Sequence, residues 1–419
     1  MQDTQTACMN LHVTQETTPE GVRRTLFLDN VSDPSQSSRE IYFDLLDETS
    51  APVPEVMDGF VMGILFYAMR LGQDICVKGA MTRTALRNLE EIQLAWSLWR
   101  KDRYRKINIY PEKIIEVTSV SAQTREAISA FSGGVDSLFT ALRHAEKSPV
   151  RLTDIAYPLK KTVLLVHGFD VPLSAPDHLA ALKARTAPFL EEMGLDLKII
   201  RTNLKELRLQ NWEDSFISQL SCCMQNYAHK YYYGLVGSSN PYDQFIVPWG
   251  SNPITDHLFS GEDFKIIIDG CGHDRTQKVA EIARHQMATK VVKVCWEGKE
   301  THKNCGVCEK CVRTILNFKA VGMDNPSCFE TILTLEDVRN ISPRNQAQAN
   351  ELRQIAAYAK KEGSMSVEWI KELERKARSY RPPNLFERKI LPKCKTAVHL
   401  LKEGNVSDFT QKLKKHLSK

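Results

Sequence analysis

The chain has 419 residues, of which 42% are hydrophobic, and a formal net charge of +5. At about 150 residues per domain, this length predicts two or three domains, and the hydrophobic content is sufficient for real cores. The sequence has neither a basic-then-apolar leader nor an apolar run of about 18 residues, so we expect a soluble, cytoplasmic protein that is neither exported nor membrane-spanning.

Residues 1–120 alternate strand and helix signals and are predicted to form an N-terminal α+β accessory domain. The strands are expected at 10–14, 25–28, 40–45, 74–78 and 107–110, and the helices at 56–71 and 83–99. No pattern here has catalytic spacing, and Trp96 and Trp99 are interpreted as core or interface anchors. The domain is therefore assigned a capping role or the binding of a partner protein.

Residues 121–325 alternate strand and helix as an open, doubly wound and mostly parallel sheet does. The strands are expected at 127–131, 162–166, 197–201, 244–247 and 265–268, and the helices at 177–193, 212–233 and 274–285. Ligands of such sheets bind beyond the carboxyl ends of the strands. We therefore expect the functional site among the loops that follow residues 131, 166, 247 and 268.

Residues 326–419 are predicted to be a helical appendage that packs on the catalytic domain or forms a homodimer contact, with helices at 350–361, 366–379 and 407–416. The tail 381–419 holds ten Lys or Arg against three Asp or Glu, a net charge of +7, so the rest of the chain sums to −2. That balance argues against a broadly basic nucleic-acid-binding surface. Only two aromatic residues, Phe386 and Phe409, lie among the tail's charges, which favours a solvated helix pair over binding to RNA, an acidic partner or a neighbouring subunit.

Residues 132–137, between a predicted strand and a predicted helix, read Ser-Gly-Gly-Val-Asp-Ser. Adjacent glycines let the backbone approach a ligand closely, and the following helix offers unpaired amide donors that favour an anion. Ser132 and Ser137 add hydroxyl donors, and Asp136 can hold a magnesium ion or a water molecule. The pattern predicts a phosphate cradle that differs from the Walker loop, which needs a lysine after its second glycine. A glycine turn that merely joins two elements is the alternative.

Four cysteines, Cys295, Cys305, Cys308 and Cys311, follow the pattern C-x9-C-x2-C-x2-C. Four thiolates form a closed tetrahedral site, as a structural zinc ion requires, and such an ion would hold the knuckle 295–311 together rather than act as a Lewis acid. An iron–sulfur cluster is the alternative. The other seven cysteines are expected to be reduced and packed as small apolar residues. They are Cys8, Cys76, Cys222, Cys223, Cys271, Cys328 and Cys394.

The loop at 132–137 resembles the PP-loop of ATP pyrophosphatases, and with Cys-x9-Cys-Gly-x-Cys-x2-Cys-x-Arg at 295–313 the chain is similar to 7-cyano-7-deazaguanine synthase, a queuosine-pathway family. The resemblance covers about residues 125–325. It implies a PP-loop/HUP-like fold, bound ATP and Mg²⁺, and a zinc ion on the four cysteines. It also implies that 7-carboxy-7-deazaguanine is activated with ATP and condensed with ammonia to an amide, which is then dehydrated to the nitrile. The implied ATP-binding residues are Ser132, Gly133, Gly134, Asp136 and Ser137.

The chain departs from that family at residues 249–257, which read Trp-Gly-Ser-Asn-Pro-Ile-Thr-Asp-His where the queuosine enzymes carry Gly-Val-Asn and then Tyr-Pro-Asp-Cys-Arg. It is also longer at both ends. We interpret it as a divergent relative with a changed acceptor. The resemblance extends to elongated relatives in bacterial antiviral gene clusters, where the activated carboxyl would be transferred to a protein amine.

Several polar residues at the predicted strand ends are candidates for the site, each with a plainer structural alternative. His167 and Asp170 are expected to line the ATP site. The substrate-binding candidates are Ser251, Asn252, Asp256, His257, Asp274 and Arg275. Asp256 and His257 would handle a proton or be ordinary loop residues, and Asp274 would bind substrate or simply cap a helix.

The predicted mechanism is adenylation of a carboxylate with release of pyrophosphate, followed by attack of an amine. Asp136, Ser132 and Lys278 are assigned to catalysis, and Arg275 and Lys278 would neutralise the leaving pyrophosphate. Two other functions stay open: a tRNA-modifying thiolase with Cys271 as its reactive thiol, and a non-catalytic nucleotide-sensing scaffold.

Overall fold

The computed structural model describes residues 8–33, 39–46, 48–116, 126–148, 156–159, 162–295, 297 and 303–381. The helix predicted at 407–416, and all of the basic tail beyond residue 381, lie outside these residues. Among the helices that are described, none combines the length and apolarity needed to cross a membrane.

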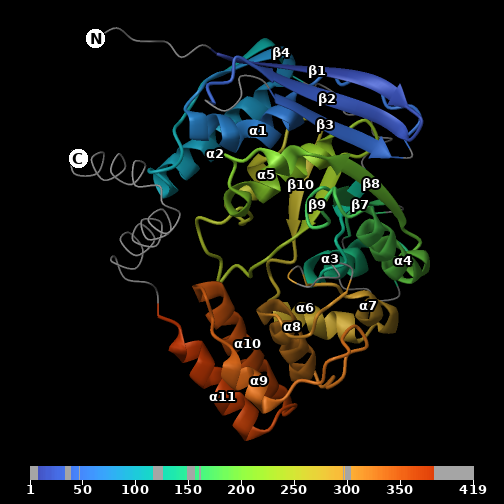
Figure 1. The fold of residues 1–419 in the computed structure, drawn as a ribbon, viewed down its shortest axis with the longest axis vertical. Helices are drawn as coiled ribbons and strands as arrows, with labels where there is room; N and C mark the ends of the chain where they lie inside the picture. The colour runs from blue at the N-terminus through green and yellow to red at the C-terminus, as the bar shows by residue number, and fades with distance from the viewer. Residues whose placement is uncertain are drawn as a thin grey trace, which may run out of the picture.

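One ten-stranded sheet runs through the described chain in the order β10-β9-β6-β7-β8-β3-β2-β1-β4-β5 (Figure 1). Its strands are β1 (Met9–Thr18), β2 (Gly21–Asp29), β3 (Arg39–Leu46), β4 (Ile75–Thr82), β5 (Ile109–Ile115), β6 (Ala127–Ala130), β7 (Thr162–His167), β8 (Asp196–Thr202), β9 (Tyr233–Gly237) and β10 (Lys265–Asp269). Most neighbouring strands are parallel, whereas β1–β2, β2–β3 and β3–β8 pair antiparallel. The strands of the first 120 residues therefore continue the sheet of the central region through the β3–β8 pair.

Helices cover both faces of this sheet, as the doubly wound prediction requires. Successive strand residues point to opposite faces. Ile128 and Val236 pack in one apolar core with α1 (Asp58–Leu71), α2 (Arg83–Trp99) and α5 (Trp212–Gln225). Their neighbours Ala127 and Leu235 pack in a second core with α3 (Val135–His144), α4 (Pro176–Met193) and α6 (Arg275–Ala283). The α/β fold class and the mostly parallel sheet are confirmed.

The strand order reverses between β6 and β9, because β7 and β8 lie on one side of β6 while β9 and β10 lie on the other. Ligands of open α/β sheets bind at such a reversal, outside the carboxyl ends of the strands. Helix α3 comes very close to β9 there: a Cβ atom on Gly237 would lie 2.5 Å from the carbonyl oxygen of Asp136. The glycine that ends β9 thus allows the loop after β6 to pack against it.

Two predicted elements in this region are wrong. Helix α5 ends at Gln225 instead of continuing to residue 233, and residues 244–247 are an irregular segment rather than a strand. The fourth strand is β9, which was not predicted from the sequence. Its run Tyr-Gly-Leu-Val-Gly is only five residues long and holds two glycines, so it gives a weak strand signal.

The C-terminal region packs on the central region through α10 (Gln346–Glu362), while α9 (Leu335–Asn340) and α11 (Val367–Ser379) complete it (Figure 1). Leu352 and Ile355 of α10 share an apolar core with Ile315 of α8 (Glu309–Ala320). A short helix, α7 (Gln286–Val291), precedes the cysteine knuckle. The predicted packing of the appendage on the catalytic domain therefore agrees with the structure.

The prediction of reduced thiols is wrong for Cys8 and Cys76, which form a disulfide. These residues are 68 positions apart in the sequence. The parallel pairing of β1 with β4, in which Asn10 lies opposite Cys76, brings them together. Because that pairing is a long-range feature of the sheet, cysteine spacing alone did not reveal it.

Candidate functional site

The glycine loop lies at the point where the strand order reverses, between β6 and α3. Gly133 has φ of +72°, a conformation that side-chain-bearing residues rarely adopt, and Gly134 is the N-cap of α3. Two hydroxyls hold the turn: Ser137 Oγ donates to the Gly134 carbonyl at 3.0 Å, and Ser132 Oγ accepts from the Gly134 amide at 3.4 Å. These hydrogen bonds hold the loop in a turn conformation without a bound ligand.

Asp136, in the first turn of α3, is held by two cations from α6. Its Oδ2 lies 3.0 Å from Arg275 Nη1, and its Oδ1 lies 3.2 Å from Lys278 Nζ. Burial alone would raise the pKa of Asp136, but the charges of Lys278 and Arg275 outweigh it and hold that pKa below its ordinary value. The structure thus brings together three residues that the sequence assigned to the site, from segments about 140 positions apart.

Lys278 is fixed, since its side chain is only 1% exposed. Its Nζ donates to the carbonyl oxygen of Ser238 at 2.5 Å and to the Ser238 hydroxyl at 2.9 Å. Ser238 follows β9, and Asp136 follows β6. Lys278 therefore connects the segments that follow these two neighbouring strands, between which the strand order reverses. Sequence reasoning missed Ser238 because it also missed β9.

Two further lysines, Lys293 and Lys310, lie beside the loop and were not predicted. The Lys293 amide donates to the Gly133 carbonyl at 2.8 Å, and Lys310 is in the first turn of α8. Burial lowers the pKa of both ammonium groups, and both interact electrostatically with Asp170. Within the described part of the chain, neither ammonium group has a hydrogen-bond or ion-pair partner. These positive charges are available to an anion, and their only signal in the sequence is that each is close to a cysteine of the knuckle.

The four predicted metal ligands come together. The sulfur atoms of Cys295, Cys305, Cys308 and Cys311 all lie within 4.8 Å of one another. The Cys295–Cys308 and Cys305–Cys311 sulfur pairs are each 3.9 Å apart. Zinc–sulfur bonds of about 2.3 Å in a tetrahedron place sulfurs about 3.8 Å apart. The cluster therefore fits a metal ion such as zinc, and four thiolates leave no open coordination position.

Backbone geometry around the cysteines is built for this knuckle. Gly306 has φ of +74°, and a Cβ atom there would lie 1.9 Å from Thr331 Oγ1, so no other residue fits. Asn304 accepts from the amides of Val294 and Cys295 and donates to two carbonyls on either side of the site. The knuckle thereby fixes the segment that presents Lys293 and, through α8, also Lys310.

His167 and Asp170 lie at the carboxyl end of β7, as predicted. His167 is buried, its Nε2 is 3.1 Å from the Pro172 carbonyl oxygen, and burial lowers the pKa of its imidazole. This contact holds the loop that follows β7. Asp170 is exposed, and its electrostatic interaction with Lys293 and Lys310 places it near the phosphate-binding candidates.

The polar run at 251–257 is a closed hydrogen-bond network. Asp256 accepts from the Ser251 hydroxyl at 2.6 Å and from the Asn252 amide at 2.8 Å. Asp256 is fully buried, and burial raises its pKa to about 8. The adjacent His257 is exposed instead. The expected proton-handling pair is thus divided between the interior and the surface.

Two other candidates have structural explanations. Asp274 is the N-cap of α6 and forms a capping box with Gln277, which is the plainer of its two predicted roles. Cys271 is 3% exposed, and burial raises the pKa of its thiol. A raised pKa opposes formation of the nucleophilic thiolate, so this site does not have the environment of a reactive cysteine.

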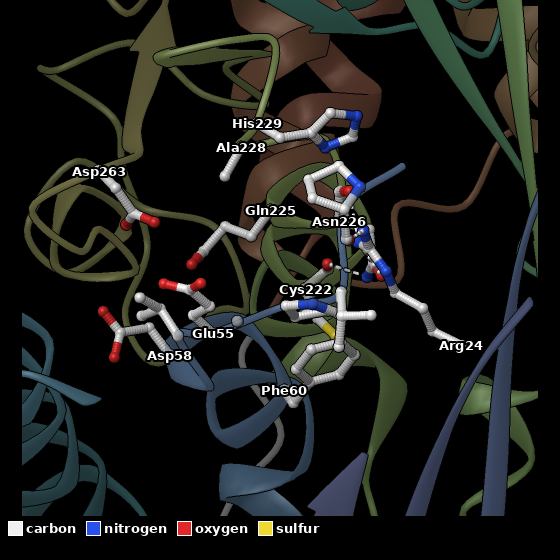
Figure 2. Close-up of a pocket in the computed structure, with 15 residues that line it drawn as sticks. Arg24, Glu55, Asp58, Phe60, Cys222, Gln225, Asn226, Ala228, His229 and Asp263 are labelled. Atoms are coloured by element: carbon white, nitrogen blue, oxygen red, sulfur yellow. Dashed lines mark hydrogen bonds between the residues drawn. The ribbon is translucent and has the colours of Figure 1, made fainter. Parts of the chain in front are cut away.

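A separate cavity of about 250 Å³ is lined by Arg24 of β2, by residues between 52 and 60 up to the first turn of α1, by residues at and just after the end of α5, and by Asp263 (Figure 2). Asp58 and Asp263 lie on one side of it and Arg24 on the other. Burial raises the pKa of Asp58 to about 7, and both of its oxygens accept hydrogen bonds from Thr82. Arg24 donates to carbonyl oxygens of Pro52 and Asn226. Asp58 and Arg24 are therefore deeply buried and bonded to the protein itself, and the cavity is not part of the loop site.

Searches of family models, of curated proteins and of solved structures return no match to this chain.

Proposed function

We propose that the chain activates a carboxylate with ATP, releases pyrophosphate, and passes the activated acyl group to an amine. The observation that carries this proposal is the convergence, at the reversal of strand order, of a glycine loop, a helix N-terminus, Asp136 and four cationic side chains. Those side chains are Arg275, Lys278, Lys293 and Lys310. Amide donors and fixed positive charge suit a polyphosphate, which carries several negative oxygens.

The residues present fit ATP and magnesium. The Gly133 conformation and the free amides at the start of α3 form a cradle for phosphate oxygens. Asp136 keeps a partly exposed carboxylate, with 24% of its side chain accessible, which suits a hard cation. Magnesium bound there would neutralise charge on the phosphate oxygens that leave as pyrophosphate.

The chemistry assigned to the chain's own residues is mainly electrostatic. A carboxylate oxygen of the substrate attacks the α-phosphorus, the bond to the β-phosphate oxygen breaks, and pyrophosphate leaves. Loop amides, Lys278 and Arg275 stabilise the negative charge that develops on the pyrophosphate. An amine then attacks the acyl carbon and loses a proton, and AMP leaves. The cysteine site takes no part in these steps, since its ligand set is closed.

The substrate we propose is 7-carboxy-7-deazaguanine, on the strength of the sequence resemblance at 132–137 and 295–313. The acceptor is ammonia, giving an amide and then the nitrile, or a protein amine, giving a conjugate in an antiviral setting. The different sequence at 249–257, whose polar groups bond to one another, is consistent with a rebuilt acceptor side.

The test is incubation with ATP, magnesium and 7-carboxy-7-deazaguanine, with and without ammonia. Pyrophosphate release and product masses are measured for the wild type and for Asp136→Ala. We expect substrate-dependent pyrophosphate, an amide or nitrile or a mass increase on a protein, and no turnover in the variant. ATP binding without pyrophosphate release would contradict this proposal and favour another carboxylate or a nucleotide-sensing scaffold.

A further inference from the structure

Glu351 of the C-terminal helix α10 reaches the catalytic part of the molecule. It is 8% exposed, and donors from two other helices surround its carboxylate. Asn317 Nδ2 donates to Oε1 at 2.8 Å, Arg313 forms an ion pair with Oε2, and Arg275 Nε lies 3.6 Å from Oε1. A buried carboxylate of the appendage is thereby connected to the residues around the glycine loop.

Arg275 is shared between two carboxylates. Its Nη1 lies 3.0 Å from Asp136 Oδ2 while its Nε faces Glu351. Asp136 has Lys278 as a second cationic partner, at 3.2 Å. A carboxylate engaged by two cations must release at least one of them before it can bind magnesium.

Of the two cations, Arg275 is the one that can leave Asp136. Lys278 is almost fully buried and its Nζ is fixed by the Ser238 carbonyl and hydroxyl. Arg275 already has Glu351 as a second anionic partner, so it keeps one carboxylate beside it when it moves away from Asp136. The guanidinium has five N–H donors, which lets it contact Glu351 and a phosphate oxygen at the same time.

We propose that Glu351 is a positioning residue that draws Arg275 away from Asp136 when ATP and magnesium bind. The C-terminal helices would thereby determine how much magnesium the site needs for ATP binding. This inference rests on the proposed ATP chemistry. Glu351 acts through Arg275 and does not touch the substrate. Removing its charge leaves Arg275 on Asp136, where it competes with magnesium.

The competing explanation is that Glu351 only anchors α10 to α8. Glu309 provides the matched control, because it pairs with Arg313 and accepts from Gln348 of α10 at 3.0 Å without a contact to Arg275. Glu309→Gln therefore weakens the same helix interface and leaves the Arg275 connection intact. Glu351→Gln keeps the side-chain volume and an acceptor for Asn317.

The experiment titrates magnesium against binding of α,β-methylene-ATP, which resists cleavage, for the full chain and each variant by calorimetry. We expect Glu351→Gln to need about five- to tenfold more magnesium for half-maximal binding, the range of one net hydrogen bond, because Glu351 acts on magnesium only through Arg275. Glu309→Gln should stay within about twofold of wild type at equal thermal stability, since it does not touch Arg275. In an Arg275→Met background, Glu351→Gln should have no further effect on the magnesium requirement.

An unchanged magnesium requirement in Glu351→Gln would overturn the inference while leaving the proposed function standing. So would an effect of equal size in Glu309→Gln, or one that persists without Arg275. If the wild-type chain binds no α,β-methylene-ATP with magnesium, the proposed function fails and this inference fails with it.

Discussion

Asp256 offers a prediction that needs no substrate. Its side chain is fully buried, it accepts hydrogen bonds from Ser251 and Asn252, and no cation contacts it within the described residues. Burial raises the pKa of Asp256 from an ordinary value of 3.8 to about 8 in the folded state. Ionising this carboxyl is therefore less favourable in the folded chain than in the unfolded chain, where the carboxyl is exposed to water.

The magnitude follows from linkage between protonation and folding. Between about pH 4 and pH 8 the folded chain retains a proton on Asp256 that the unfolded chain has lost, so the free energy of unfolding falls as pH rises. The contribution of this group is fully present below pH 3.8 and is lost as pH rises toward about 8. Between these two pKa values, the free energy of unfolding falls by about 1.4 kcal/mol per pH unit. Between pH 5 and pH 7 the loss is therefore about 3 kcal/mol.

The perturbation is Asp256→Asn. The amide keeps an acceptor for the Asn252 N–H and can donate to the Ser251 hydroxyl, so it mimics the protonated acid. Urea unfolding followed by tryptophan fluorescence at pH 5, 6 and 7 gives the free energy of unfolding of both proteins. We expect the loss of stability between pH 5 and pH 7 to be smaller in the variant by about 3 kcal/mol.

Parallel pH dependences for the two proteins would refute this reasoning, because they would mean that Asp256 titrates near its ordinary value. The same variant also tests the earlier sequence-based role of Asp256 in substrate binding. Loss of turnover in a folded and stable variant would support a role of Asp256 in substrate binding.

Three further predictions concern the metal knuckle, the loop lysines and the disulfide. Cys308→Ser should lose bound metal and soluble yield together, measured by elemental analysis and circular dichroism; a folded, metal-free variant would contradict a structural role. Lys293→Ala and Lys310→Ala should each weaken ATP-analogue binding by about tenfold or more, as loss of one charge-assisted contact does; unchanged affinity in calorimetry would remove that lysine from the site. Cys76→Ser should lower the free energy of unfolding by about 2–4 kcal/mol without altering ATP binding; equal stability of variant and wild type under oxidising conditions would contradict a contribution from the Cys8–Cys76 bond.

The loop and the knuckle were predictable because their signals are local. The glycines and serines of 132–137 act within one turn, and the amides of Cys308 and Cys311 each donate to the sulfur of the cysteine three residues earlier. Alternation of strand and helix signals likewise predicted the fold class and most of the elements. In each case the chemistry is fixed by neighbours a few residues apart.

The rest depends on contacts between distant segments. Lys293 and Lys310 become candidates only because the knuckle packs beside Gly133, and Cys8 meets Cys76 only through the pairing of β1 with β4. The failure to predict β9 has another cause: a run of five residues with two glycines is too short and too weak in β propensity to indicate a strand. Asp274 and Asp256 lie near strand ends, where site residues are often found. In the structure, however, Asp274 caps helix α6, and Asp256 accepts a hydrogen bond from Ser251 within a buried loop.

The central claim is that the loop site cleaves ATP between the α- and β-phosphates. Phosphorus-31 NMR of the nucleotide products, with wild type and Asp136→Ala side by side in the presence of 7-carboxy-7-deazaguanine, tests it most directly. The account predicts AMP and pyrophosphate from the wild type and unreacted ATP from a variant that unfolds like the wild type. ADP and phosphate, or equal AMP formation by both proteins, would contradict it.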